Sequence, residues 1–116
     1  MPLLVGINSG KEILPSECAC GPVIIKFTAE WCKPCKQIQP LFEEIASRYE
    51  KDGLMFVTSD VDIEIEFGKD VRSLPTFVFL LDGVEIEKFR TEGSNNILQV
   101  EKNTRGLAEL AQQTLR

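Results

Sequence analysis

Two short runs of the chain are almost continuously apolar, which is the pattern of strands buried on both faces of a sheet. They are residues 23–27 and residues 54–58, and the second ends near residues 60–62. From Pro34 onward, apolar residues recur at helical spacing between charged ones. These apolar positions are Ile38, Leu41, Phe42, Ile45 and Tyr49. Pro40 removes one helical N–H, so the pattern predicts a kinked helix rather than a broken one.

The second half of the chain predicts a hairpin and two helices. Residues 76–81 and 84–89 flank an Asp-Gly dipeptide, which is the strongest short signal for a β-hairpin. A short helix is expected over about residues 63–69. A closing helix is expected from near Thr104, with one apolar face. That face carries Leu107, Leu110, Ala111 and Leu115.

The segment before the closing helix is harder to interpret. Residues 91–96 are polar and predict a loop. Residues 97–100, Ile-Leu-Gln-Val, fit either a packed surface loop or an extra strand or partner-contact element. The order strand, helix, strand, helix, hairpin and helix predicts an α/β fold with a central mixed sheet.

Length and composition fit one soluble domain over residues 1–116, with 43% hydrophobic and 27% charged residues. The net charge of −5 argues against nucleic acid as a partner. The chain has no histidine, which excludes imidazole catalysis and His-ligated metal sites. No apolar stretch approaches the roughly 18 residues of a membrane span. The start also lacks the basic region and long apolar run of a secretory signal. We therefore expect no membrane association.

Four cysteines without a secretion signal favour redox or metal chemistry in a cytoplasmic or other reducing compartment. Cys32 and Cys35 are separated by two residues, so they can close a small disulfide and reopen it, as in electron transfer between dithiols. The reactive form is the thiolate, which the free N–H groups of a helix N-terminus favour. Cys32 lies just before the predicted helix, and we expect its pKa to lie below that of a free cysteine.

The run from Lys26 to Lys36, K-F-T-A-E-W-C-K-P-C-K, resembles the active-site segment of the thioredoxin family. Pro40 in the next helix and the downstream Leu-Pro-Thr at residues 74–76 match the same family, and the resemblance covers about residues 23–90. It implies the thioredoxin fold, with a central mixed sheet flanked by helices on both faces. It also implies a thiol-disulfide oxidoreductase that takes part in electron transport and cell redox homeostasis.

The resemblance assigns different roles to the two cysteines. Cys32 is the exposed nucleophile that attacks a client disulfide, and Cys35 is the buried thiol that resolves the mixed disulfide. No bound cofactor is implied, because the two sulfurs carry the electrons. The implied partners are disulfide-containing client proteins and an upstream reductase of the thioredoxin-reductase type. We expect a monomer.

The resemblance also points to substrate-binding residues. Trp31 fits a core residue or, directly before the nucleophile, a flat apolar surface that contacts the client. The family implies a cis peptide bond between Leu74 and Pro75, lying against the dithiol. The Leu74 backbone would then pair with an extended client segment, next to Thr76.

Three further residues are expected to support the dithiol. Lys33 and Pro34 lie between the cysteines, where Lys33 replaces the usual glycine and favours the Cys32 thiolate. Lys26 stands where most thioredoxins have a buried aspartate. It either extends its amine to solvent or is a buried amine that exchanges a proton with Cys35 or stabilises its thiolate. Its nearest partner candidates are Glu30, Thr58 and Asp60.

Two other features leave alternatives open. The family's glycine beside the substrate groove is not evident, since Arg90 and Thr91 fall there and Gly93 comes a few residues late. A bulky Arg90 would narrow or charge that groove. Cys18 and Cys20 form a labile regulatory pair or are inert thiols. A zinc site that joins them to the Cys32–Cys35 pair is disfavoured, because a strand of about 15–17 Å separates the two pairs.

These features leave three functional hypotheses. The first is a protein-disulfide reductase. The second is a thioredoxin-fold interaction module with specialised or weak redox activity, marked by Lys26, Arg90 and the long loop before the closing helix. The third is a zinc-binding structural domain.

Overall fold

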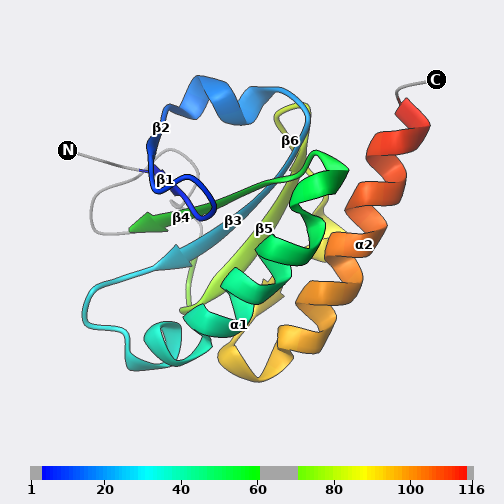
Figure 1. Cartoon of the computed structure of the whole chain (residues 1–116). Coiled ribbons are helices and arrows are strands. Elements are labelled where there is room, and N and C mark those ends of the chain that lie inside the picture. Colours follow the sequence, from blue (N-terminus) through cyan, green and yellow to red (C-terminus); the bar gives the residue numbers. More distant parts are fainter. Residues whose placement is uncertain (1–3, 61–70, 115–116) are drawn as a thin grey trace.

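The computed structural model describes residues 4–60 and 71–114. Within them, one mixed β-sheet runs through the molecule, with strand order β2-β1-β4-β3-β5-β6 and with β7 also paired to β5 (Figure 1). The strands are β1 (Leu4–Gly6), β2 (Glu12–Ile13), β3 (Pro22–Thr28), β4 (Met55–Asp60), β5 (Thr76–Leu81), β6 (Val84–Glu85) and β7 (Thr91–Glu92).

The central strand β3 is the one predicted from the first apolar run. It pairs in parallel with β4, where Lys26 lies opposite Thr58, and antiparallel with β5, where Lys26 lies opposite Phe77. The second apolar run forms β4, as predicted. The side chains of a strand alternate between its faces, so Ile24 and Lys26 point to one side of the sheet and Ile25 to the other.

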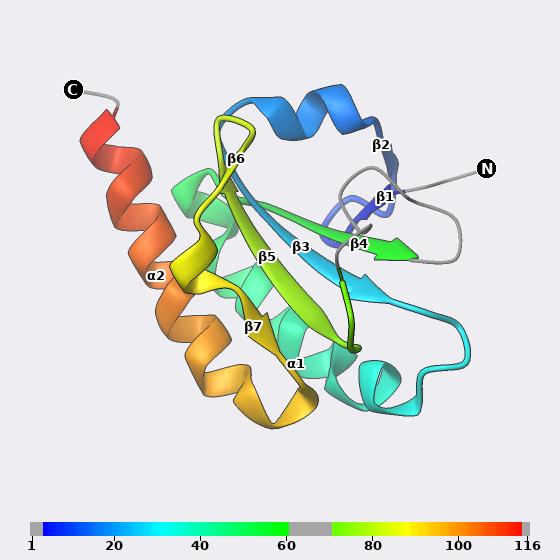
Figure 2. The same ribbon diagram turned by 180° about the vertical axis from the view of Figure 1, so that it is seen from behind.

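The two α-helices, α1 (Lys33–Tyr49) and α2 (Ile97–Thr114), lie side by side on one face of the sheet, as both views show (Figures 1 and 2). Side chains from α1, from α2 and from the strands beneath them form one apolar core. It includes Ile24, Phe56, Phe77 and Phe79 of the sheet, Ile38, Phe42 and Ile45 of α1, and Val100 and Leu107 of α2. α1 continues through Pro40, whereas Leu41 lies outside the buried stripe and is 45% exposed.

The opposite face of the sheet carries a second apolar core. Its buried residues are Leu4, Cys18, Val23, Ile25, Phe27, Val57, Val78 and Leu80. Cys18 comes from η1 (Pro15–Ala19), a 3-10 helix, so among the described residues this short helix covers the second face. The helix predicted over residues 63–69 lies outside the described residues.

The predicted hairpin forms, but its second strand is shorter than expected. β6 ends at Glu85, and the 3-10 helix η3 (Glu87–Phe89) interrupts the strand before β7 pairs again with β5. A regular strand would place Phe89 on the same solvent-facing side as Glu85. The turn instead brings the Phe89 ring against Phe79, edge-on and 5.8 Å between centroids. Burial of this aromatic ring outweighs the few strand hydrogen bonds that are lost.

The closing helix begins earlier than predicted. α2 starts at Ile97 and not near Thr104, so residues 97–100 are its first turn and neither a loop nor a strand. The 3-10 helices η4 (Ser94–Asn96) and, after α1, η2 (Glu50–Asp52) complete the described elements.

Two polar residues of α2, Asn103 and Thr104, form hydrogen bonds inside the fold. Thr104 Oγ1 donates to the Val100 carbonyl at 2.7 Å.

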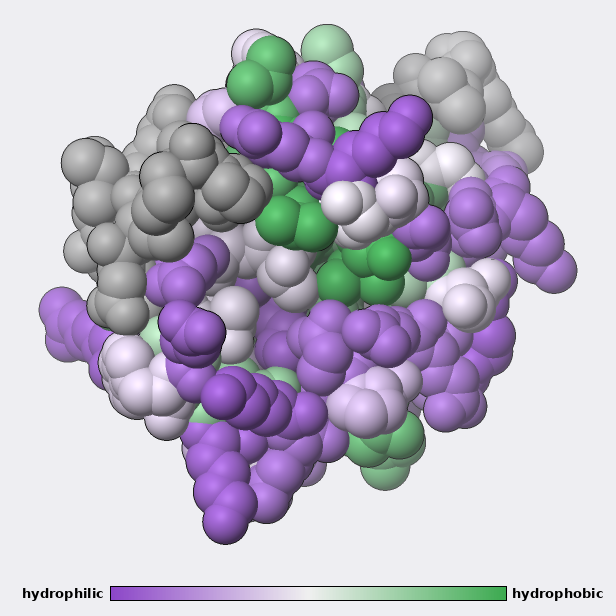
Figure 3. All heavy atoms as spheres, turned by 60° about the vertical axis from the view of Figure 1, so that its left-hand side comes forward, coloured by the Kyte–Doolittle hydropathy of each residue, from purple (hydrophilic) through white to green (hydrophobic). Residues whose placement is uncertain are grey.

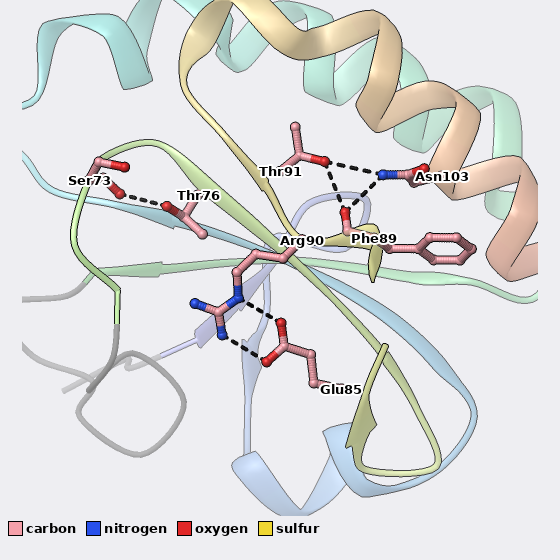
Figure 4. A network of polar contacts seen from close by, with 7 residues as sticks. All are labelled: Ser73, Thr76, Glu85, Phe89, Arg90, Thr91 and Asn103. Atoms are coloured by element: carbon pink, nitrogen blue, oxygen red, sulfur yellow. Dashed lines mark hydrogen bonds and ion pairs between the residues drawn. The ribbon is translucent and has the colours of Figure 1, made fainter. Parts of the chain in front are cut away.

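Asn103 joins α2 to the strand that it covers. Its side-chain Nδ2 donates to the Phe89 carbonyl at 2.8 Å and lies 3.2 Å from Thr91 Oγ1 (Figure 4). Thr91 Oγ1 itself donates to the Phe89 carbonyl at 2.9 Å. This contact fixes the chain at the point where it leaves η3 and enters β7.

Replacing Asn103 by alanine should destabilise the protein by about 1 kcal/mol, because one net hydrogen bond is lost while Thr91 still satisfies the Phe89 carbonyl. Urea denaturation measures this change. Asn95→Ala, at an exposed position one turn before α2, is the control and should leave the midpoint unchanged. Equal midpoints for Asn103→Ala and the parent would mean that the Asn103 hydrogen bond does not stabilise the fold.

The side of the molecule that carries β1 and β2 is mostly hydrophilic, with hydrophobic side chains gathered in a few small areas toward the upper middle of the view (Figure 3). Among the described residues, no helix is long and apolar enough to span a bilayer.

Candidate active site

Cys32 and Cys35 form a disulfide at the N-terminus of α1, with their Cα atoms 5.4 Å apart. Cys32 is the N-cap residue, and its Sγ accepts a hydrogen bond from the Cys35 backbone N–H at 3.2 Å. The helix starts here because the Cys32 carbonyl accepts from Lys36 N, while Pro34 stands in the first turn, where no N–H is needed. The Cys32 sulfur therefore lies where a helix terminus favours negative charge.

The expectation of an exposed Cys32 is wrong for the disulfide form. Cys32 is only 4% exposed and Cys35 is fully buried. Both pack with Ala29 and with Leu74 from the segment before β5, and this contact covers the disulfide. The two cysteines nevertheless face different surroundings, because Cys32 lines an open groove and Cys35 borders a hollow on the other side of α1.

The groove beside Cys32 has a volume of about 550 Å³. Its lining residues come from two segments: Trp31, Cys32, Lys33 and Pro34 from the start of α1, and Val71, Arg72, Ser73 and Leu74 from the segment before β5. Trp31 is 70% exposed, so the alternative that it is a core residue is wrong. The peptide bond between Leu74 and Pro75 is cis, as the family resemblance implied.

Hydrogen bonds hold the cis-proline loop, residues 73–76, in place. Thr76 Oγ1 donates to the Ser73 carbonyl at 2.6 Å, within the turn (Figure 4). Gly93 N donates to the Pro75 carbonyl at 2.8 Å. Glu92, next to Gly93, accepts from Ser73 Oγ at 3.0 Å. The segment after β7 therefore fixes the position of the groove wall.

Gly93 lies against the cis-proline through its hydrogen bond to the Pro75 carbonyl, and Arg90 is not among the residues that line the groove. Gly93 has φ of +90°, which an L side chain rarely adopts. Arg90 instead points toward Glu85 of β6, with its Nε and Nη2 2.7 Å from the two carboxylate oxygens (Figure 4). The 3-10 helix η3 lies between β6 and β7, so the spacing along the chain does not reveal which residue reaches Pro75.

Lys26 is buried beneath α1, at 2% exposure, so the solvent-directed alternative is wrong. Its Nζ donates to the Cys35 carbonyl at 2.7 Å and to Gln39 Oε1. The expected partners Glu30, Thr58 and Asp60 line the hollow next to it. Burial lowers the pKa of Lys26 to about 8, while the nearby Glu43 opposes this change.

Sequence reasoning missed Gln39 as a partner of Lys26. Gln39 follows Cys35 by four residues on α1, so both lie on one helix face. This face turns toward Lys26, because the strand alternation places Lys26 on the side of the sheet that α1 covers. The i, i+4 spacing was therefore a usable signal, but only once the helix start was known.

The other two cysteines are not in a disulfide. Cys18 is buried and Cys20 is exposed, so they do not form the labile disulfide considered above. Within residues 4–60 and 71–114, no group of three or more Cys, Asp or Glu side chains is placed to hold a metal ion.

A disulfide at a helix N-terminus, next to a cis-proline loop on a mixed α/β sheet, defines a dithiol-disulfide site of the thioredoxin type. The thioredoxin family model matches residues 11–103. The chain belongs to the thioredoxin family.

Curated relatives and solved structures agree with this assignment. The chain is 38% identical over 90 residues to putative thioredoxin H10 of Arabidopsis thaliana, which covers 76% of this chain and 55% of that protein. It is 38% identical over 91 residues to thioredoxin H4-1 of rice (Oryza sativa subsp. japonica), covering 77% and 66%. Oxidized mitochondrial thioredoxin 3 of Saccharomyces cerevisiae matches with a TM-score of 0.70 and 30% identity, over 79% of this chain and 85% of that chain.

The chain spans between about half and two thirds of the length of the plant relatives that it matches.

Proposed function

We propose that this protein reduces disulfide bonds in client proteins through the Cys32–Cys35 dithiol. The observation that carries the proposal is the disulfide at the N-terminus of α1, which borders an open groove through Cys32. The domain would act as a two-electron carrier within residues 1–116, in the cytoplasm or another reducing compartment. An upstream reductase would return it to the dithiol form.

The two cysteines would act in sequence. The Cys32 thiolate attacks one sulfur of the client disulfide, forms a mixed disulfide and releases the other client sulfur as a thiolate, which takes up a proton. Cys35 then loses its proton and attacks Cys32 Sγ. The Cys32–Cys35 bond forms, the bond to the client breaks, and the second client thiolate leaves. The client has gained two electrons, and the protein is left as the disulfide.

The groove supplies the contact with the client. Trp31 offers an exposed aromatic face beside Cys32, which suits an apolar client segment. Leu74 precedes β5 and takes no part in the sheet pairing of the described residues, whereas the Pro75 carbonyl is already bonded to Gly93 N. An extended client segment can therefore pair with the Leu74 backbone by strand addition, with Thr76 at the end of the groove.

Lys33 should tune the reduction potential of the couple by a small amount. Its cation stabilises the Cys32 thiolate and hence the reduced protein. Lys33→Gly should therefore make the couple more reducing by roughly 10–20 mV, since exposed charges are screened by salt. The potential is measured by equilibration with glutathione. Lys33→Arg keeps the charge and should match the parent, and equal potentials for all three proteins would mean that Lys33 is only a surface residue.

Insulin reduction tests the proposed function. With dithiothreitol as electron donor, catalytic amounts of the protein should accelerate the precipitation of the insulin B chain well above the rate with dithiothreitol alone. Protein that has been reduced and then alkylated is the control and should give no acceleration. A native protein with an intact disulfide but no acceleration would contradict the proposal and favour the interaction module.

A further inference from the structure

Lys26, Gln39 and Glu43 are joined by hydrogen bonds that lead from β3 to the surface of α1. The Lys26 ammonium donates to Gln39 Oε1, and Gln39 Nε2 donates to the Glu43 carboxylate at 3.2 Å. Gln39 and Glu43 follow Cys35 at intervals of four residues, so all three lie on one face of α1. The Cys35 carbonyl accepts the other hydrogen bond of Lys26, at 2.7 Å.

The orientation of the Gln39 amide has an electrostatic consequence. Its oxygen faces the ammonium and its NH₂ faces the carboxylate, so the amide dipole favours both charges at once. The reversed amide would place a donor against a donor and an acceptor against an acceptor. Gln39 therefore transmits the favourable field of Glu43 to an amine whose pKa burial lowers.

We propose that Gln39 and Glu43 are positioning residues that set the pH at which Lys26 gains and loses its proton. This inference rests on the proposed function where it concerns turnover.

We expect Lys26 to receive the proton of Cys35, because the two residues line the same hollow. In the mixed disulfide, the Cys35 thiol gives its proton to the neutral Lys26 amine, and the Cys35 sulfur attacks Cys32 Sγ. The client thiolate leaves and takes a proton from water. The Lys26 ammonium returns its proton to water through the adjoining hollow of about 310 Å³. The rate of the resolving step should then rise with pH as Lys26 loses its charge.

Other charged groups also face the amine, and they set the background for the test. Lys36 of α1, Glu30 after β3 and Asp60 of β4 all line the same hollow. They remain unchanged in every variant below, so the differences between variants report on Gln39 and Glu43 alone.

The test compares Gln39→Leu, Glu43→Gln and Gln39→Glu with the parent. Loss of the bridge or of the carboxylate should move the Lys26 titration to lower pH by about 0.5–1 pH unit, and Gln39→Glu, which places a carboxylate next to the amine, should move it to higher pH. The Lys26 titration is followed by ¹³C NMR of its ε-carbon in the disulfide form. The pH profile of insulin reduction should move in the same directions.

Glu44→Gln is the matched control. It removes the same charge one residue further on, where the carboxylate lies 3.4 Å from Arg48 and is largely exposed. Its Lys26 titration should equal that of the parent. Unchanged titrations in Gln39→Leu and Glu43→Gln would overturn the inference even if insulin is reduced. Titrations that move as expected in a protein that does not reduce insulin would uphold the positioning role and reject the proposed function.

Discussion

Cys32→Ser should lower insulin reduction to the rate of dithiothreitol alone, whereas Cys35→Ser should stop the reaction with the client attached. The reason is that the two sulfurs have different access. Cys32 lines the open groove and caps α1, where the helix N-terminus stabilises its thiolate. Cys35 is fully buried, is bonded to Cys32 and does not line the groove. A client disulfide can therefore approach Cys32 and not Cys35.

Trapping measures this division of roles. Cys35→Ser mixed with oxidised insulin should give a covalent complex on a non-reducing gel, and dithiothreitol should release it. Cys32→Ser should give none. Cys20→Ser removes an exposed free thiol outside the site and should behave as the parent in both assays. A complex formed through Cys35 in the Cys32→Ser protein would overturn the assignment.

The parts of the fold that were predicted correctly have strong local patterns. β3 and β4 are continuous apolar runs, and α1 combines a helical period with a Cys-x-x-Cys segment that can cap it. The Asp-Gly turn predicted the hairpin, and Asp82 indeed has a positive φ of 52°. In these elements local preference and tertiary packing favour the same structure.

The errors lie where long-range packing overrides the local pattern. The closing helix was expected to start near Thr104, but Asn103 and Thr104 are satisfied inside α2 and against Phe89, and the helix extends back to Ile97. Phe89 leaves the strand pattern to reach Phe79. Both contacts join segments whose relative position the sequence does not specify.

The site was predictable in its chemistry but not in its environment. The motif identified Cys32, Cys35 and the proline loop, and the family resemblance implied the cis bond. The partners of Lys26 and the place of Gly93 depend on the three-dimensional structure, because Gln39 lies on a different element from Lys26 and η3 interrupts the chain between β6 and β7. Burial of Cys32 likewise depends on Leu74, which is distant in sequence.

Lys26→Met should stabilise the disulfide form at pH 7, because the buried ammonium costs free energy in the folded state. The lowered pKa of about 8, against 10.5 for an unperturbed lysine, corresponds to roughly 3 kcal/mol if converted in full. The amine borders a hollow where solvent screens part of its charge, so we expect a gain of about 1–2 kcal/mol. Gln39, half-buried, can bond to water once the amine is gone.

The pH dependence fixes the sign of this effect. Between about pH 8 and pH 10.5 the unfolded chain binds more protons at Lys26 than the folded protein does, so the parent gains stability as pH rises. The penalty is fully present below pH 8 and disappears toward pH 10.5. The advantage of Lys26→Met should therefore be largest at pH 7 and should vanish at the upper end of this range.

Urea denaturation of the oxidised proteins from pH 7 to pH 10.5 measures both quantities, and Lys51→Met, at an exposed lysine in η2, is the matched control with no advantage at any pH. Lys26→Met should also reduce insulin more slowly than the parent, because Cys35 loses its proton acceptor. A Lys26→Met protein less stable than the parent at pH 7 would mean that the hydrogen bonds to Cys35 and Gln39 outweigh the burial of the charge. Greater stability with unchanged turnover would leave Lys26 without a part in the reaction.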